Sequence, residues 1–205
     1  GQRNIVAPMQ ITEDARLPAD VEAQPTVQAA AALKSVIRGY RDDLEREQRL
    51  PKPLVEQCHA AGFYRLVRPR KLGGLQLDPL TYLRTVELLA EASGSVGWNL
   101  CNNNIAQLVT LGLPDDGIQE IFGPKEVAIA GTAVQGGGRA VPVDGGYRVT
   151  GRWPFGTGCQ ESAWMLGSFQ ILDGDQVRRS PDGASVYWRG LFHRSEAQLV
   201  PGSWD

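Results

Sequence analysis

The chain has 205 residues, of which 42% are hydrophobic and 21% charged, a composition typical of a soluble globular protein. Its formal net charge of −2 leaves no broad basic surface, which argues against nucleic acid or an anionic membrane as a partner. No apolar run approaches the roughly 20 residues of a membrane-spanning helix, and the N-terminus lacks the hydrophobic segment of a signal peptide, so we expect a cytoplasmic protein.

Glycine is distributed unevenly along the chain, with 9 residues in 1–122 and 15 in 123–205. The first part has helical periodicity, whereas the second has short β-prone runs separated by turns. We therefore divide the chain into an extended N-terminal leader over 1–26, a helical domain over 27–124 and a β-domain over 125–205. A helical block followed by a strand block predicts an α+β protein rather than alternating βαβ units.

Five helices are expected in the first part. Pro53 can begin one helix and Gly62 can end it, because proline fits the first helical position and glycine the residue after the last. Asp78 followed by Pro79 is a cap residue before a first-turn proline. Ser95 is a candidate cap for the next helix. The expected helices are 27–46, 53–61, 79–93, 96–113 and 115–123.

The second part contains five short β-prone runs separated by glycine-rich and aspartate-rich turns. The expected strands are 127–134, 147–155, 162–172, 184–192 and 197–201. Their close spacing predicts a small antiparallel sheet or barrel. The segment QGGGR, at 135–139, lacks the lysine and the following helix of a phosphate-binding loop, so we expect a hairpin turn there.

Residues with metal-binding or nucleophilic side chains are few. The chain has three widely spaced cysteines and two histidines, which support neither a disulfide framework nor a metal site. A Ser-His-Asp triad is equally hard to assemble from two histidines. If the protein is an enzyme, we therefore expect a cofactor to carry out the chemistry, and the catalytic residues stay unassigned.

The stretch GRWPFGTGCQESAW, residues 151–164, joins the end of one expected strand to the start of the next. Two of its aromatic residues suit a sheet core. Packing in a sheet does not explain why Gly156 and Gly158 lie on either side of Thr157. Glycines at such a place mark a bulge or a point where the backbone comes close to a ligand. We therefore expect a ligand to lie near this turn.

The fourth expected helix carries residues that suit a cavity. Trp98 follows Gly97 and could line a substrate cavity, although an aromatic residue on an amphipathic helix is commonly core. Three consecutive asparagines follow at 102–104, where such poor helix formers either end a helical turn or direct polar groups into a cavity. We take Trp98, Asn103 and Asn104 as candidate substrate-binding residues.

The order of these segments resembles the acyl-CoA dehydrogenase superfamily, from about residue 27 to the end. The resemblance looks closest to its flavin-dependent monooxygenase branch, where the corresponding strand pair typically runs G-x-W-x-F-x-S-G-C with a tryptophan five or six residues later. This chain has Gly151, Trp153, Phe155, Thr157, Gly158, Cys159 and Trp164 at those places. ASGSVGWNL, at 92–100, is also similar to the segment that precedes the family's fourth helix.

The resemblance implies a flavin site, with FMN or FAD supplied in reduced form by a partner reductase. Thr157 matches the residue that hydrogen-bonds the flavin near N5 and O4, and Gly158 belongs to the same motif. Phe155 matches the aromatic residue beside the isoalloxazine ring. Thr132 falls where the dehydrogenases place a threonine at the pyrimidine edge. Neutral donors of this kind can tune a flavin without adding charge.

The sequence also departs from the family pattern. The family continues into a C-terminal helical bundle that completes the sites, supplies the dehydrogenases' catalytic glutamate and builds a tetramer, and that bundle is absent from this chain. The dehydrogenases' Thr-Glu-Pro loop is replaced by TAVQGGGR. Asparagines stand where some monooxygenases carry a substrate-site histidine. We therefore expect an acyl-CoA dehydrogenase-like fold that is incomplete here and tetrameric at full length.

The expected function is the oxygenase component of a two-component monooxygenase, which would use reduced flavin and O2 to hydroxylate an aromatic or similar small organic substrate. One alternative is an FAD-dependent acyl-CoA dehydrogenase, which needs a carboxylate base to abstract a proton. Another is a non-catalytic fragment that keeps the fold as a binding module.

Overall fold

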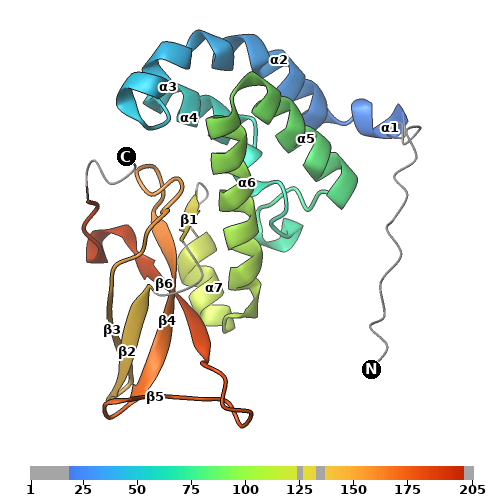
Figure 1. Cartoon of the computed structure of the whole chain (residues 1–205). Coiled ribbons are helices and arrows are strands. Elements are labelled where there is room, and N and C mark those ends of the chain that lie inside the picture. The colour runs from blue at the N-terminus through green and yellow to red at the C-terminus, as the bar shows by residue number, and fades with distance from the viewer. Residues whose placement is uncertain (1–18, 124–126, 133–136, 201–205) are drawn as a thin grey trace, which may run out of the picture.

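Helices fill the first half of the described chain and strands fill the second half (Figure 1). The computed structural model describes residues 19–123, 127–132 and 137–200. Most of the predicted leader, the predicted domain boundary at 124/125 and the last residue of the final predicted strand lie outside these ranges. The predicted order of a helical block followed by a strand block is confirmed.

The helices begin and end where local chemistry favours it. Asp78 precedes α5 and its carboxylate accepts hydrogen bonds from the backbone N–H groups of Leu80 and Thr81, at 3.0 and 3.1 Å, which caps the helix as predicted. Over the described ranges, no helix combines the length and the apolar character needed to cross a membrane. The helices are α1 (Ala19–Glu22), α2 (Pro25–Gly39), α3 (Arg41–Glu47), α4 (Lys52–Ala60), α5 (Pro79–Ala92), α6 (Gly94–Val109) and α7 (Asp115–Phe122).

Several predictions for the helical block were wrong, including the end of the helix expected over 96–113, which lies at Val109. The single helix expected over 27–46 divides at Tyr40 into α2 and α3, because Gly39 weakens the helix before it. The leader expected to be extended over 1–26 is helical where it is described, since α1 and the start of α2 lie in it. Ser95 does not cap α6, which begins one residue before it at Gly94.

The main hydrophobic core lies among the helices. It contains fully buried side chains of α2, α4, α5, α6 and the short 3-10 turn Phe63–Arg65. Helix α5 packs between α2 and α6. Gly97 allows the close crossing of α5 and α6, because a Cβ at Gly97 would lie only 2.5 Å from the Cβ of Ala90. The residues of this core include Val27, Ile37, Leu54, Cys58, Phe63, Tyr64, Leu66, Leu89 and Leu100.

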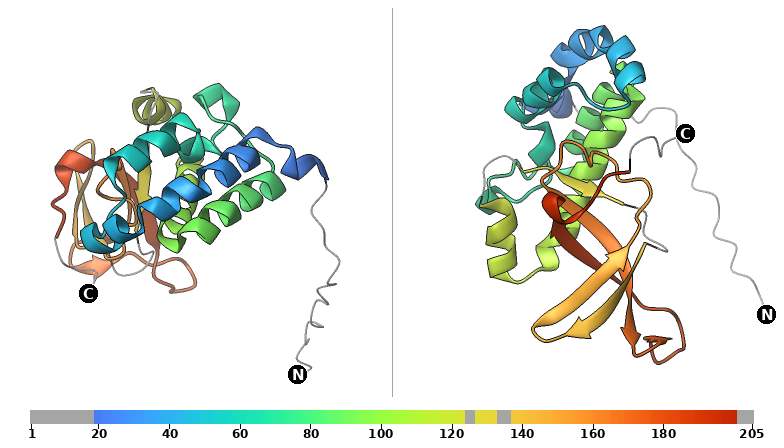
Figure 2. Two further views of the ribbon diagram at one scale, coloured as in Figure 1. Left: turned by 90° about the horizontal axis from the view of Figure 1, so that it is seen from above. Right: turned by 90° about the vertical axis from the view of Figure 1, so that its left-hand side faces the viewer.

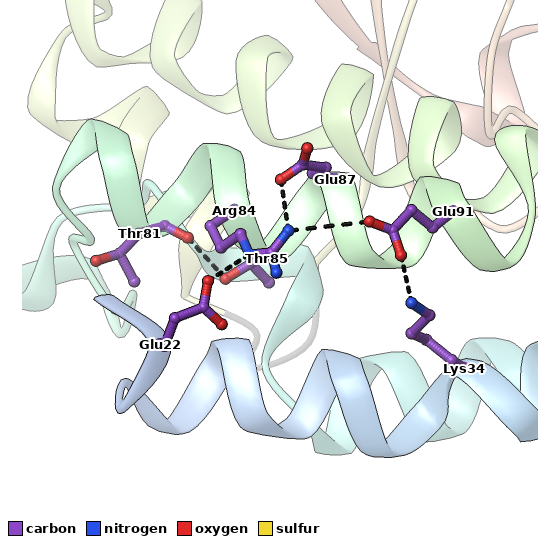
Figure 3. A network of polar contacts seen from close by, with 7 residues as sticks. All are labelled: Glu22, Lys34, Thr81, Arg84, Thr85, Glu87 and Glu91. Carbon is purple, nitrogen blue, oxygen red and sulfur yellow. Dashed lines mark hydrogen bonds and ion pairs between the residues drawn. The ribbon is translucent and has the colours of Figure 1, made fainter. Parts of the chain in front are cut away.

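A polar network ties the N-terminal helices to α5 (Figure 3). Arg84 of α5 donates a hydrogen bond of 2.7 Å to Glu22 of α1 and one of 2.8 Å to Glu87. Glu91, one turn further along α5, pairs with Lys34 of α2. Single exposed ion pairs contribute little. A shared network joining three helices nevertheless fixes how α1 and α2 lie against α5.

The sheet is built around one long central strand, β4 (Trp164–Asp173). Along one edge β4 pairs in parallel with β1 at Ile129↔Trp164 and with β2 at Gly138↔Phe169. Its other edge pairs antiparallel with β6 and then with β5. The remaining strands are β1 (Ile129–Gly131), β2 (Gly138–Val143), β3 (Gly146–Gly151), β5 (Gln176–Val177) and β6 (Tyr187–His193).

The sheet is mixed, so the prediction of a purely antiparallel sheet was wrong. Strands β1 and β2 lie one after the other along the same edge of β4, and both run parallel to it. Gly138 and Arg139, expected in a hairpin turn, begin β2 instead. Residues 197–200, expected in a strand, lie outside every strand and follow the 3-10 turn Arg194–Glu196.

Helix α6 joins the two halves, extending from the helical block to the side of the sheet in all three views (Figures 1 and 2). Its buried amides reach the loop after α4. Asn104 Oδ1 accepts a 2.8 Å hydrogen bond from Leu66 N, and Asn104 Nδ2 donates to Phe63 O at 2.7 Å. Gln107 Nε2 donates to Tyr64 O, and Gln107 Oε1 accepts from the buried Arg68 guanidinium. The loop is therefore held by side chains of α6.

Replacing Asn104 with alanine should lower the free energy of unfolding by about 3 kcal/mol, because it leaves the Leu66 N–H and the Phe63 carbonyl buried without their partner. The matched control is Asn102→Ala on the same helix, where the amide only reaches back to Trp98 O. Urea denaturation of both variants measures the difference. Equal losses in the two variants would contradict this role of Asn104.

Candidate functional site

A cavity of about 310 Å³ lies where the end of α3 and the first two turns of α6 meet the turn that leads into β4. Leu44 and Arg49 contribute from the α3 side, Trp98 and Asn99 from α6, and residues 156–161 from the turn. Its volume is in the lower part of the range found for small-molecule sites. The cavity thus forms where the helical block meets the sheet.

The stretch 151–164 reaches this cavity because its first tryptophan is anchored in the sheet. Trp153 Nε1 donates a 2.7 Å hydrogen bond to Ser168 O of β4, and the ring packs against Phe192 of β6. The chain then turns, and Thr157 forms an isolated bridge with Gly131 at the end of β1. This bridge brings the turn beside Thr132, although 25 residues separate Thr132 from Thr157.

The turn itself is strained. Phe155 has a φ of 58°, a left-handed conformation that non-glycine residues adopt at a cost of roughly 1–3 kcal/mol. Thr157 N donates a 2.8 Å hydrogen bond back to Phe155 O, which closes a tight loop around Gly156. Thr157 is buried, and its hydroxyl has no hydrogen-bond partner within the described part of the chain. A free hydroxyl therefore lines the cavity.

Gly158 lets the turn approach α6 closely. It has a φ of 75°, and a Cβ there would lie 2.6 Å from Asn103 Nδ2 and 3.2 Å from both side-chain amide atoms of Asn99. Asn103 is fully buried and donates to Asn99 Oδ1 at 3.2 Å. The backbone of the turn thus rests directly on the amides of α6.

The cavity also contains a carboxylate. Asn99 Nδ2 donates a 2.6 Å hydrogen bond to Glu161 Oε1. Burial raises the pKa of the Glu161 carboxyl above its usual value, while the hydrogen bond from Asn99 and the charge of Arg49 act in the opposite direction. Within the described residues no cation forms an ion pair with Glu161. Glu161 is half-buried, and carboxylates that are partly removed from water without a counter-charge are concentrated at functional sites.

The structure brings some of the predicted site residues together and separates others. Thr157, Gly158 and Trp98 all line the cavity. Asn103 contacts the turn from α6, and Asn104 faces the loop after α4. Neither residue lines the cavity.

The remaining predicted flavin residues lie beside the cavity rather than in its wall. Thr132 donates its hydroxyl proton to Leu166 O at 2.9 Å, which leaves only the acceptor capacity of its oxygen for a ligand. Phe155 is 67% exposed and does not line the cavity. Both roles stay predictions.

Two cavity residues were missed in the sequence. Glu161 is a carboxylate directly between a glycine-rich turn and an apolar strand, which is a pattern that could have been noticed. Asn99 lies four residues before Asn103, on the same face of the helix. Across the described ranges, no group of three or more His, Cys, Asp or Glu side chains is arranged to hold a metal ion.

Comparison with known proteins agrees with this geometry. Residues 22–115 match the acyl-CoA dehydrogenase N-terminal domain. The HsaA monooxygenase structure from Mycobacterium tuberculosis superposes with a TM-score of 0.77 at 28% identity, covering 87% of this chain and 47% of that one. The chain shares the N-terminal domain and the fold of the acyl-CoA dehydrogenase superfamily. The sheet that follows the matched domain is therefore the superfamily's β-domain, and the predicted fold is confirmed.

Relatives found by sequence are named monooxygenases or hydroxylases. The flavin-dependent monooxygenase oxygenase subunit HsaA of M. tuberculosis is 32% identical over 163 residues, which are 76% of this chain and 40% of that protein. The structure of XiaF from Streptomyces sp. in complex with FADH2 and glycerol has a TM-score of 0.75 at 26% identity, covering 86% of this chain and 43% of that one. The chain spans less than half the length of each relative.

Replacing Gly158 with alanine should lower the free energy of unfolding by about 3 kcal/mol, because it combines a left-handed backbone with a collision against Asn103. Gly183→Ala is the matched control, since Gly183 has a φ of 82° with no atom within 4 Å of an added Cβ. That control should cost only about 1 kcal/mol. Thermal or urea unfolding compares the two variants, and equal losses would argue against the close contact with α6.

Glu161→Gln should stabilise the protein increasingly as the pH rises above about 4.5, the usual pKa of glutamate. The folded-state pKa of Glu161 is raised, so between the unfolded and folded pKa values the folded state binds more protons and loses stability with rising pH. Glutamine removes that loss and can keep the hydrogen bond from Asn99. Urea denaturation at several pH values measures the difference between variant and wild type, which should be smallest in acid. A difference independent of pH would contradict this assignment.

Proposed function

We propose that this chain contributes the N-terminal and β-domains of the oxygenase component of a two-component flavin-dependent monooxygenase. Such a protein would hydroxylate a small aromatic or similar organic substrate. The observation that carries the proposal is the hydroxyl of Thr157, which has no hydrogen-bond partner in the described chain and lies in a cavity also lined by Trp98. The similarity to HsaA, a flavin-dependent monooxygenase oxygenase subunit, and to the XiaF structure with bound FADH2 supports the same function.

The turn at 156–158 fits a flavin. Thr157 offers a hydroxyl without a partner in the described chain, and the glycines beside it let a planar ring approach the backbone. Thr132 lies beside it through the bridge between Gly131 and Thr157. We assign Thr157 and the backbone of Gly158 as flavin contacts, with Thr132 at the pyrimidine edge. Reduced FMN or FAD would supply the electrons that activate O2.

The protein's own residues would then orient the reactants and exclude water. The aromatic face of Trp98 suits a flat substrate, which it would hold on the α6 side of the cavity. The turn stays in place because it rests on the amides of Asn99 and Asn103. Exclusion of water strengthens every hydrogen bond made to a bound flavin. A flavin reductase partner, a tetrameric assembly and a cytoplasmic location stay predictions.

An acyl-CoA dehydrogenase requires a carboxylate base, and Glu161 is a carboxylate in the cavity. Reaction with substrate distinguishes the two functions. Full-length protein loaded with oxidised FAD should not be bleached by acyl-CoA thioesters under anaerobic conditions. With reduced flavin and O2 it should insert oxygen into an aromatic substrate such as resorcinol. Bleaching by an acyl-CoA would overturn the monooxygenase proposal.

Thr157→Val should weaken the binding of reduced FMN or FAD about ten-fold, the effect of losing one hydrogen bond of about 1.4 kcal/mol. Thr157→Ser keeps the hydroxyl and should bind within about two-fold of wild type. Anaerobic titration of full-length protein with each reduced flavin gives the dissociation constants. Unchanged affinity in Thr157→Val would remove Thr157 from the flavin site.

A further inference from the structure

Glu161 stands out among the acidic residues of the described chain. Glu22, Glu45 and Glu91 all pair with basic side chains at the surface, whereas Glu161 faces the cavity and its partner is a neutral amide. Arg49 lines the same cavity, but its guanidinium pairs with Glu47 at 3.1 Å. A carboxylate placed in this way keeps hydrogen-bonding capacity for a ligand.

The orientation of Glu161 is fixed from α6. Asn103 donates to Asn99 Oδ1, which turns the amide of Asn99 so that its NH2 group points to Glu161 Oε1, at 2.6 Å. This contact engages one carboxylate oxygen. No other side chain of the described residues donates a hydrogen bond to this carboxylate. The two asparagines therefore hold a carboxylate that can accept a hydrogen bond from a bound molecule.

An aromatic surface lies on the same cavity. Trp98 is 63% exposed and comes from the same two turns of α6 as Asn99. Its indole offers a flat face for an aromatic ring on the α6 side of the cavity. Ionisable lining residues are Glu45, Arg49, Cys159 and Glu161, so the cavity lining contains two carboxylates and one guanidinium.

We infer that Glu161, oriented by Asn99, determines substrate specificity by accepting a hydrogen bond from a hydroxyl or N–H group of a neutral aromatic substrate and by rejecting substrates that carry a carboxylate. This inference rests on the proposed function for the identity of the cavity as the substrate site. Rejection follows because a substrate carboxylate would lie beside the Glu161 carboxylate, and Arg49, the basic residue in the cavity lining, pairs with Glu47 instead.

Equilibrium binding of two matched probes tests the inference without requiring turnover. The probes are p-cresol and p-hydroxyphenylacetate, which share a phenol ring and differ by one carboxylate. Isothermal titration calorimetry on full-length protein gives both dissociation constants. Wild type should bind p-cresol at least about ten-fold more tightly, and Glu161→Gln should reduce that ratio about ten-fold by relieving the repulsion.

Glu45→Gln is the matched control, because Glu45 borders the same cavity, is exposed and pairs with Arg41. It makes the same change of charge and should leave the ratio within about two-fold. Asn99→Ala should also reduce the ratio, whereas Asn102→Ala should not. Circular dichroism confirms that each variant is folded.

Three results would overturn the inference. They are a wild type that binds neither probe, a wild type that binds p-hydroxyphenylacetate as tightly as p-cresol, and an unchanged ratio in Glu161→Gln. A different result would overturn the monooxygenase proposal. In that case the protein would not hydroxylate its substrate with reduced flavin and O2, although the ratio of probe affinities would still depend on Glu161.

Discussion

The buried side-chain amides of α6 are the interaction on which the arrangement of this protein depends. Asn104 and Gln107 bind the loop after α4, whereas Asn99 and Asn103 support the turn that leads into the central strand. One helix thereby fixes a loop of the helical block and a turn of the sheet. Because amides both donate and accept, each contact requires a defined position of the backbone opposite. The contacts of Asn99 and Asn103 hold the turn that lines the cavity against α6.

Local chemistry made much of the helical block predictable from sequence. The cap at Asp78 followed by Pro79 determined the start of α5 through atoms within three residues of each other. The order of helices and strands followed from periodicity in the same way. The parallel pairing of β1 and β2 with β4 did not, because no local pattern shows which edge of a strand a distant segment will join.

The asparagine run shows why the candidate site was predicted only in part. Successive helical residues point about 100° apart. Asn102 therefore reaches back along its own helix, Asn103 faces the turn and Asn104 faces the opposite loop. A polar run on a helix was correctly taken as unusual, but its direction depends on packing between segments far apart in sequence. Asn99 and Glu161 were missed for the same reason, since their contact spans 62 residues.

The hydrogen bond of Trp153 reaches a backbone group of the central strand β4 between the stretches that pair with β1 and with β2. Strand β4 pairs with β1 through Leu166 and with β2 from Phe169, so Gly167 and Ser168 fall between the two partners. The indole N–H bonds to Ser168 O at this point, and a Cβ on Gly167 would lie 3.0 Å from the indole ring. A side chain thus takes the place of one rung of the ladder. Phenylalanine at position 153 would fill much of the same space but has no N–H group to bond to Ser168 O. The pairing along this edge of β4 would then be interrupted next to the turn that carries Thr157.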